Sequence, residues 1–219
     1  MRSIRLRHSL RLLPTLAAGI IACGGEKGPT QPAAPTTLEG QYKGTMAGGP
    51  TVSASLDLTV AASMTGTIKP VGAAPIAVTG TYVASTGGVA VSGGGFTITG
   101  TIDNTGSLLG TSTHTSGPGN VVAYQHTIAN PVTVFCGTYT GDADGIWNLA
   151  RRGTSLSGAY VNVPDGSHGY LPGTLSGNSI SITVAGGGTA TGTLSGTTMS
   201  GTWSGGGGYG GTWTSNTTC

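Results

Sequence analysis

Apolar and polar residues alternate with a period of two along most of the chain after residue 38. The segments Phe96–Ile102, Leu56–Val60 and Ile180–Val184 place apolar residues on one face and mostly hydroxyl residues on the other. Successive side chains of a strand point to opposite faces, so this pattern predicts half-buried antiparallel strands. Gly-Gly, Asp-Gly and Asn-Thr-Gly turn signals separate the segments. No stretch has a convincing helical period, and the pattern predicts an all-β protein.

Short motifs recur in the same order in the two halves of the chain. Gly40–Gly44 resembles Gly137–Gly141 at an offset of 97, and the offset then falls to about 91. The further matching pairs are Ser63–Ile68 with Ser155–Tyr160, Phe96–Ile102 with Thr189–Leu194, and Ser107–Thr111 with Thr198–Thr202. This order predicts an internal duplication. The two units are antiparallel meanders of about eight short strands, covering residues 38–129 and 136–219 and joined near Asn130-Pro131.

Glycine is the most informative residue type for the architecture. The chain has 42 glycines, and several, such as Gly66 and Gly100, lie on the apolar face of a strand. A narrow closed barrel needs small residues where its walls converge, whereas an open eight-stranded sheet leaves its edges exposed. We therefore expect two tandem small up-and-down barrels. A β-sandwich with glycines at bulges, or one continuous barrel made by both halves, remains an alternative.

The second half of the chain resembles a known barrel family. Gly137-Thr-Tyr139, Ile146–Leu149 and Ser155–Tyr160 are similar to the opening of avidin-type barrels, which begin Gly-Thr-Trp and continue Leu-Thr-Gly-Thr-Tyr. The resemblance covers most of residues 137–214 and implies an up-and-down barrel. Avidins bind biotin through polar residues in the first strand and loop and through several tryptophans. Residues 138–144 lack the expected Asn and Ser, so biotin binding is not carried over.

The N-terminus has the pattern of a secretory leader. Residues 1–22 contain four arginines, of which Arg11 is the last, and the largely apolar run Leu10–Ala22, which is shorter than the roughly 20 residues of a spanning helix. The sequence Ile20-Ile21-Ala22-Cys23 resembles the lipobox of bacterial lipoproteins. That resemblance implies cleavage after Ala22, diacylglycerol on the Cys23 thiol and acylation, for example by palmitate. An ordinary secretory signal with a chance cysteine is the alternative.

The segment after Cys23 has the composition of a tether. Residues 23–37 contain three prolines and no large apolar residue. Acyl chains contribute about 0.8 kcal/mol per buried methylene, so two or more of them would hold the protein on a lipid bilayer. In enterobacteria an aspartate after the lipidated cysteine favours inner-membrane retention. Gly24 stands there, which favours the outer membrane of a bacterial cell envelope.

Charge and cysteine content restrict the partners and the compartment. Four of the nine basic residues lie in the leader, and the rest of the chain carries five basic against seven acidic residues. A nucleic-acid partner is therefore not expected. In the oxidising envelope we expect a disulfide between Cys136 and Cys219, because a closed meander brings its first and last strands together. Free thiols or an intermolecular pair are the alternatives.

The sequence contains no convincing catalytic constellation. His114, His126 and His168 lie in unrelated contexts, and the segment Asp142–Gly145 lacks the remaining ligands of a calcium loop. We therefore expect no enzyme, metal site or cofactor. The expected function is a structural or interaction role, because the barrel interiors are expected to be closed and lined by glycine. The alternative is a binding module for a small apolar ligand or glycan in a barrel mouth. A cavity of roughly 300 Å³ lined by tryptophans would favour that alternative.

Overall fold

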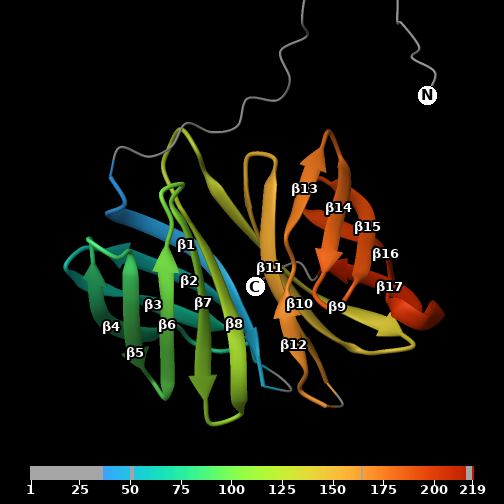
Figure 1. Cartoon of the computed structure of the whole chain (residues 1–219), viewed down its shortest axis with the longest axis horizontal. Helices are drawn as coiled ribbons and strands as arrows, with labels where there is room; N and C mark the ends of the chain where they lie inside the picture. Colours follow the sequence, from blue (N-terminus) through green and yellow to red (C-terminus); the bar gives the residue numbers. More distant parts are fainter. Residues whose placement is uncertain (1–36, 50–51, 164, 216–218) are drawn as a thin grey trace, which may run out of the picture. The chain divides into compact units, whose positions relative to one another are not determined.

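The computed structural model describes residues 37–49, 52–163, 165–215 and 219 (Figure 1). Seventeen strands account for most of these residues, and one 3-10 turn spans Gly206–Gly208. The all-β prediction is confirmed. The described part of the chain holds no helix long and apolar enough to cross a membrane. The leader, Cys23 and nearly all of the tether lie outside the described residues, so the predictions made for them remain predictions.

The first eight strands form a closed barrel. Each strand pairs antiparallel with the next, and β1 also pairs with β8. The strands are β1 (Gly40–Gly48), β2 (Val52–Val60), β3 (Ser63–Pro70), β4 (Ile76–Val83), β5 (Gly88–Gly93), β6 (Phe96–Ile102), β7 (Ser107–His114) and β8 (Gly117–Gln125). The meander therefore leaves no free edge among its strands.

The second half of the chain forms another closed ring. Its strands are β9 (Val132–Gly141), β10 (Gly145–Arg152), β11 (Ser155–Asn162), β12 (His168–Tyr170), β13 (Gly173–Ser176), β14 (Ser179–Val184), β15 (Gly188–Ser195), β16 (Thr198–Ser204) and β17 (Gly210–Ser215). The short strands β12 and β13 both pair with β11 and flank Pro172, which has no backbone N–H to donate. They occupy one position of an eight-stranded barrel, which the pairing of β9 with β17 closes. The two tandem barrels are confirmed, and the sandwich and continuous-barrel alternatives are wrong.

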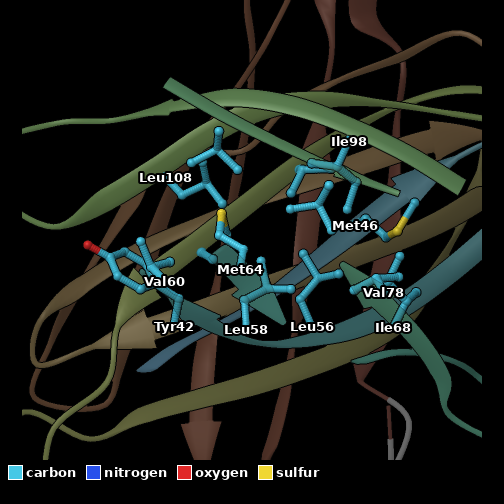
Figure 2. Packing of buried hydrophobic residues seen from close by; sticks show 14 of the residues in the cluster. Tyr42, Met46, Leu56, Leu58, Val60, Met64, Ile68, Val78, Ile98 and Leu108 are labelled. Atoms are coloured by element: carbon cyan, nitrogen blue, oxygen red, sulfur yellow. The ribbon is translucent and has the colours of Figure 1, made fainter. Parts of the chain in front are cut away.

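The interior of the first barrel is filled by its own side chains. Figure 2 shows apolar residues from different strands pointing toward one another, among them Met46, Leu56, Ile68 and Ile98. Threonines alternate with them and face outward, as the period of two requires. Complete burial of one large apolar side chain contributes about 1.5–3 kcal/mol, so this cluster is the main source of stability for the barrel.

The strand register shows how the two barrels correspond. Gly44 of β1 pairs with Leu56, and Gly137 of β9 pairs with Trp147. The next strands agree, because Leu56 pairs with Ile68 and Trp147 pairs with Tyr160. Gly44, and not Gly40, is therefore equivalent to Gly137. The sequence-based alignment of the first motif is wrong by four residues, because Gly-x-Tyr-x-Gly occurs in both strands.

Inward-facing glycines extend this correspondence around both rings. The registers of the paired strands match each inward glycine of the first barrel to one of the second, and the residue numbers of each pair differ by 91 to 93. The pairs are Gly44 with Gly137, Gly66 with Gly158, Gly80 with Gly173, Gly100 with Gly192, Gly110 with Gly201, and Gly119 with Gly211. A nearly constant offset means that the barrels can be compared residue by residue.

The second barrel is closed covalently as well as by hydrogen bonds. Cys136 in β9 and Cys219 form a disulfide with their Cα atoms 5.2 Å apart. β9 pairs with β17 from Gly211 opposite Gly141 to Ser215 opposite Gly137, which brings the two ends of the unit together. The predicted disulfide is confirmed, and it follows from the closure of the meander.

Polar contacts join the two barrels. The amide of Asn148, a fully buried residue of β10, donates to the carbonyl of Met46, and its oxygen accepts a bond from the Ser53 hydroxyl. The guanidinium of Arg152 lies 4.6 Å from the centre of the Tyr124 ring and donates to the carbonyl of Gly106. The bonds of Asn148 satisfy an amide that would otherwise be costly to bury, whereas the Nε of Arg152 is buried without a hydrogen-bond partner in the described part of the chain.

Candidate ligand-binding site

A cavity of about 300 Å³ lies at one end of the second barrel. Its lining includes residues of the loops β9–β10, β14–β15 and β16–β17 and the end of β11, which all lie at the same end of an antiparallel meander. Six aromatic residues line it: Tyr139, Trp147, Tyr160, Trp203, Tyr209 and Trp213. They include all three tryptophans of the chain. The expectation of a closed, glycine-lined interior is therefore wrong for this barrel.

Two missing side chains help to explain the hollow. In the first barrel, Ile98 and Phe96 face inward from β6, where they pair with Val91 and Gly93. In the second barrel, the same positions of β15 are Ala190 and Gly188. Ile98 and Phe96 are 0% and 4% exposed and fill the end of their barrel. The smaller residues of β15 leave that volume empty.

Aromatic residues replace aliphatic ones around the same end. Four inward positions of the first barrel are aliphatic where the second barrel is aromatic: Met46 and Tyr139, Leu56 and Trp147, Ile68 and Tyr160, and Val121 and Trp213. Trp147 and Trp213 are almost fully buried, while Tyr139 and Trp203 are partly exposed. The cavity thus has an aromatic floor and an aromatic rim.

Glycines on neighbouring strands make room for these rings. Trp147 pairs with Gly137, and a Cβ on Gly137 would lie 2.5 Å from the indole ring. Tyr139 pairs with Gly145, where a Cβ would lie 2.5 Å from the phenol carbon that bears the hydroxyl. The rings therefore lie directly over glycine backbone, an arrangement that protects glycine within a sheet. The sequence shows inward glycines, but it does not show that rings cover them.

The aromatic rings of the cavity wall pack against one another edge to face. The Trp147 and Trp213 ring centres are 5.3 Å apart with their planes at 87°, and those of Tyr139 and Trp203 are 5.9 Å apart at 77°. Aromatic pairs favour this geometry, because the positive edge of one ring meets the negative face of the other. The wall of the cavity is therefore a preorganised aromatic surface.

Five of the six aromatic residues of this wall have their polar atom paired within the protein. The indole N–H groups of Trp147, Trp203 and Trp213 donate to backbone carbonyls at 3.1–3.2 Å. The Tyr139 hydroxyl donates to the side-chain oxygen of Asn162, and the Tyr160 hydroxyl donates to the carbonyl of Ala185. Ring faces and aliphatic groups are thus the main surfaces that remain for a ligand.

Burial favours the neutral form of two tyrosines of the wall, Tyr139 and Tyr160. It raises the pKa of Tyr139 above its ordinary value, and the nearby Tyr160, Asp165 and Asp144 add to the effect. Burial also raises the pKa of Tyr160, with Asp165 as a second cause. Both phenols are therefore neutral at physiological pH, and the wall carries no formal charge.

The histidines and aspartates that the sequence offers as candidates for catalysis or metal binding do not form one cluster. The His114 ring stacks on Phe96 at 4.2 Å, and the Nδ1 of His126 accepts the N–H of Val132. His168 begins β12. Asp142 and Asp144 lie in the β9–β10 turn, as expected. Within the described ranges, no group of three His, Cys, Asp or Glu side chains is placed to hold a metal ion.

Comparison with known proteins identifies no relative of this chain. The chain matches no protein-family model, no curated protein and no solved structure at a significant level. The cavity and its lining residues are therefore the basis for assigning a function.

Proposed function

We propose that this protein is a lipid-anchored binding protein of the bacterial envelope whose second barrel takes up a small, largely apolar ligand. The observation that carries the proposal is the cavity of about 300 Å³, lined by every tryptophan of the chain. This volume is at the lower end of the range for small-molecule sites, which are concave and mostly apolar. A purely structural role, the first expectation from the sequence, does not call for such a cavity.

The comparison between the barrels supports a binding role. The first barrel shows that the fold can fill this end with Phe96 and Ile98. In the second barrel, apolar ring surface is instead left available to solvent, which forgoes about 25 cal/mol per Å² of burial. A ligand that covers the rings recovers this energy.

Binding can be tested with the intrinsic tryptophan signal, because all three tryptophans line the cavity. We expect the neutral dye N-phenyl-1-naphthylamine to bind saturably at one site and to quench tryptophan emission by energy transfer. Ala190→Ile restores the residue of the first barrel and should weaken dye binding about tenfold, or about 1.4 kcal/mol. Ala90→Ile, on the outer face of β5, is the matched control. No saturable binding by the wild type, or equal binding by Ala190→Ile, contradicts the proposal.

The membrane anchor rests on the sequence Ile20-Ile21-Ala22-Cys23. We expect Cys23→Ser to move the protein from the membrane fraction to the aqueous phase and to abolish incorporation of labelled palmitate. The double variant Cys136→Ser/Cys219→Ser should stay in the membrane and keep the label. Unchanged detergent partitioning of Cys23→Ser contradicts lipidation. We also propose the outer membrane, because Gly24 follows the cysteine.

A further inference from the structure

The three aspartates of the second barrel lie at one end of it, and its two arginines lie at the other. Asp142 and Asp144 lie in the β9–β10 turn, and Asp165 lies in the β11–β12 connection, at the end that opens into the cavity. Arg151 and Arg152 lie at the opposite end, where β10 turns into β11. The only other titratable cation within this barrel, His168, stands at the start of β12. Three carboxylates therefore stand at the cavity end, away from both arginines.

Hydrogen bonds fix two of these carboxylates beside the opening. Ala143, between Asp142 and Asp144, lines the cavity. Asp142 accepts the N–H of Gly210 at 2.8 Å, which ties the β9–β10 turn to the loop that carries Tyr209 over the cavity. Asp144 accepts the N–H of Gly141 at 3.3 Å. Both acidic residues therefore lie in a turn that borders the cavity, and together with Asp165 they are called the acidic rim.

The third carboxylate is held in its charged form. Asp165 accepts the backbone N–H of Ser167 at 2.9 Å and the hydroxyl of the same residue at 2.8 Å. These bonds lower the pKa of Asp165 below its ordinary value. Hydrogen bonds connect this carboxylate to the cavity wall, because the same Ser167 hydroxyl accepts the side-chain amide of Asn162, which lines the cavity. Asp165 and Asp144 also add to the rise in the pKa of Tyr139.

If the cavity binds a small ligand, as proposed above, we infer that this ligand is an organic cation, and specifically an ammonium group with an apolar body. The faces of tryptophan and tyrosine attract a cation placed within about 6 Å of the ring centre. Six such residues line the cavity, and the carboxylates of the adjoining β9–β10 turn and β11–β12 connection repel anions. A quaternary ammonium has no N–H group and needs no hydrogen-bond acceptor. It therefore suits a wall in which five of the six aromatic residues already have their polar atom paired.

A pair of molecules that differ only in charge tests this inference. Choline and 3,3-dimethyl-1-butanol have the same shape and the same hydroxyl, and both can be titrated by calorimetry or by displacement of N-phenyl-1-naphthylamine. We expect choline to bind about tenfold more tightly than the neutral alcohol. The double variant Asp144→Asn/Asp165→Asn should lose most of that preference while its affinity for the neutral dye is unchanged. Asp103→Asn, in the β6–β7 turn of the first barrel, is the matched control and should keep it.

The outcomes separate the two proposals. Equal binding of choline and the alcohol, or tighter binding of the alcohol, overturns the cation inference and leaves the binding function intact. An unchanged choline preference in Asp144→Asn/Asp165→Asn overturns the role of the acidic rim. If neither choline nor the dye binds the wild type, the proposed function itself fails.

Discussion

Replacing both cysteines, Cys136→Ser with Cys219→Ser, is expected to lower the free energy of unfolding of the second barrel by about 4–5 kcal/mol. The disulfide joins residues 83 positions apart, so it removes much of the chain entropy of the unfolded state. It also fixes β9 next to β17, where the ring closes. Denaturant unfolding followed by tryptophan fluorescence measures the loss, because every tryptophan lies in this barrel.

The first barrel supplies the control for this prediction. Its strands contain no cysteine and no tryptophan. Reduction of the wild type should shift the tryptophan transition as the double substitution does. A loss below about 1 kcal/mol, small beside the 2–5 kcal/mol typical of a native disulfide, would show that closure does not depend on the bridge.

Phe96→Ala is expected to destabilise the first barrel by about 3–5 kcal/mol. The Phe96 ring is almost completely buried, packs in the core cluster and stacks on His114. The truncated side chain leaves a void at the end of the barrel, and neighbouring strands held by a closed ladder relax only in part. Denaturant unfolding followed by circular dichroism measures the effect.

A companion change in the other barrel is Ala190→Ile, at the position equivalent to Ile98, which adds volume instead of removing it. Because the added methyl groups enter an existing cavity, this variant should unfold within about 1 kcal/mol of the wild type. A Phe96→Ala variant as stable as the wild type would mean that Phe96 does not fill the end of the first barrel. The contrast between a filled and a hollow barrel would then be lost.

Much of the fold could be predicted because its determinants are local. The alternation in Phe96–Ile102 identifies a strand and its buried face without reference to any other segment. Inward glycines such as Gly66 and Gly100 indicate closure, since a Cβ at Gly66 would lie 2.3 Å from the carbonyl oxygen of Asp57 on the next strand. The Cys136–Cys219 pairing then follows from closure, because it needs only the order of the strands.

The cavity could not be predicted because it depends on a comparison between two registers. Gly188 and Ala190 become significant only when they are matched to Phe96 and Ile98, and that match comes from the strand pairs. In the sequence Gly188 belongs to a glycine run, Gly186–Gly188, that also suits a turn. A difference of two side chains in a closed interior helps to decide whether the barrel is packed or hollow, and the period of two does not encode that difference.

The position of the acidic rim next to the cavity also could not be predicted from the sequence. The segment Asp142–Gly145 is correctly predicted to be a turn. Its place beside the cavity depends on Gly210, the first residue of β17, which lies 68 residues further along the chain and donates to Asp142. Long-range loop positions of this kind follow from closure of the ring and from loop geometry, which local propensity does not specify.

The most direct test of the account is the nuclear magnetic resonance spectrum of the three indole N–H groups in ¹⁵N-labelled protein. Trp147, Trp203 and Trp213 give one signal each, and all three line the cavity. On titration with choline and then with 3,3-dimethyl-1-butanol, we expect all three signals to move together with a single dissociation constant for each compound. In Ala190→Ile the same shifts should require about tenfold more of each compound. Indole signals that remain unmoved by both compounds in the wild type would contradict the claim that this cavity is the ligand-binding site.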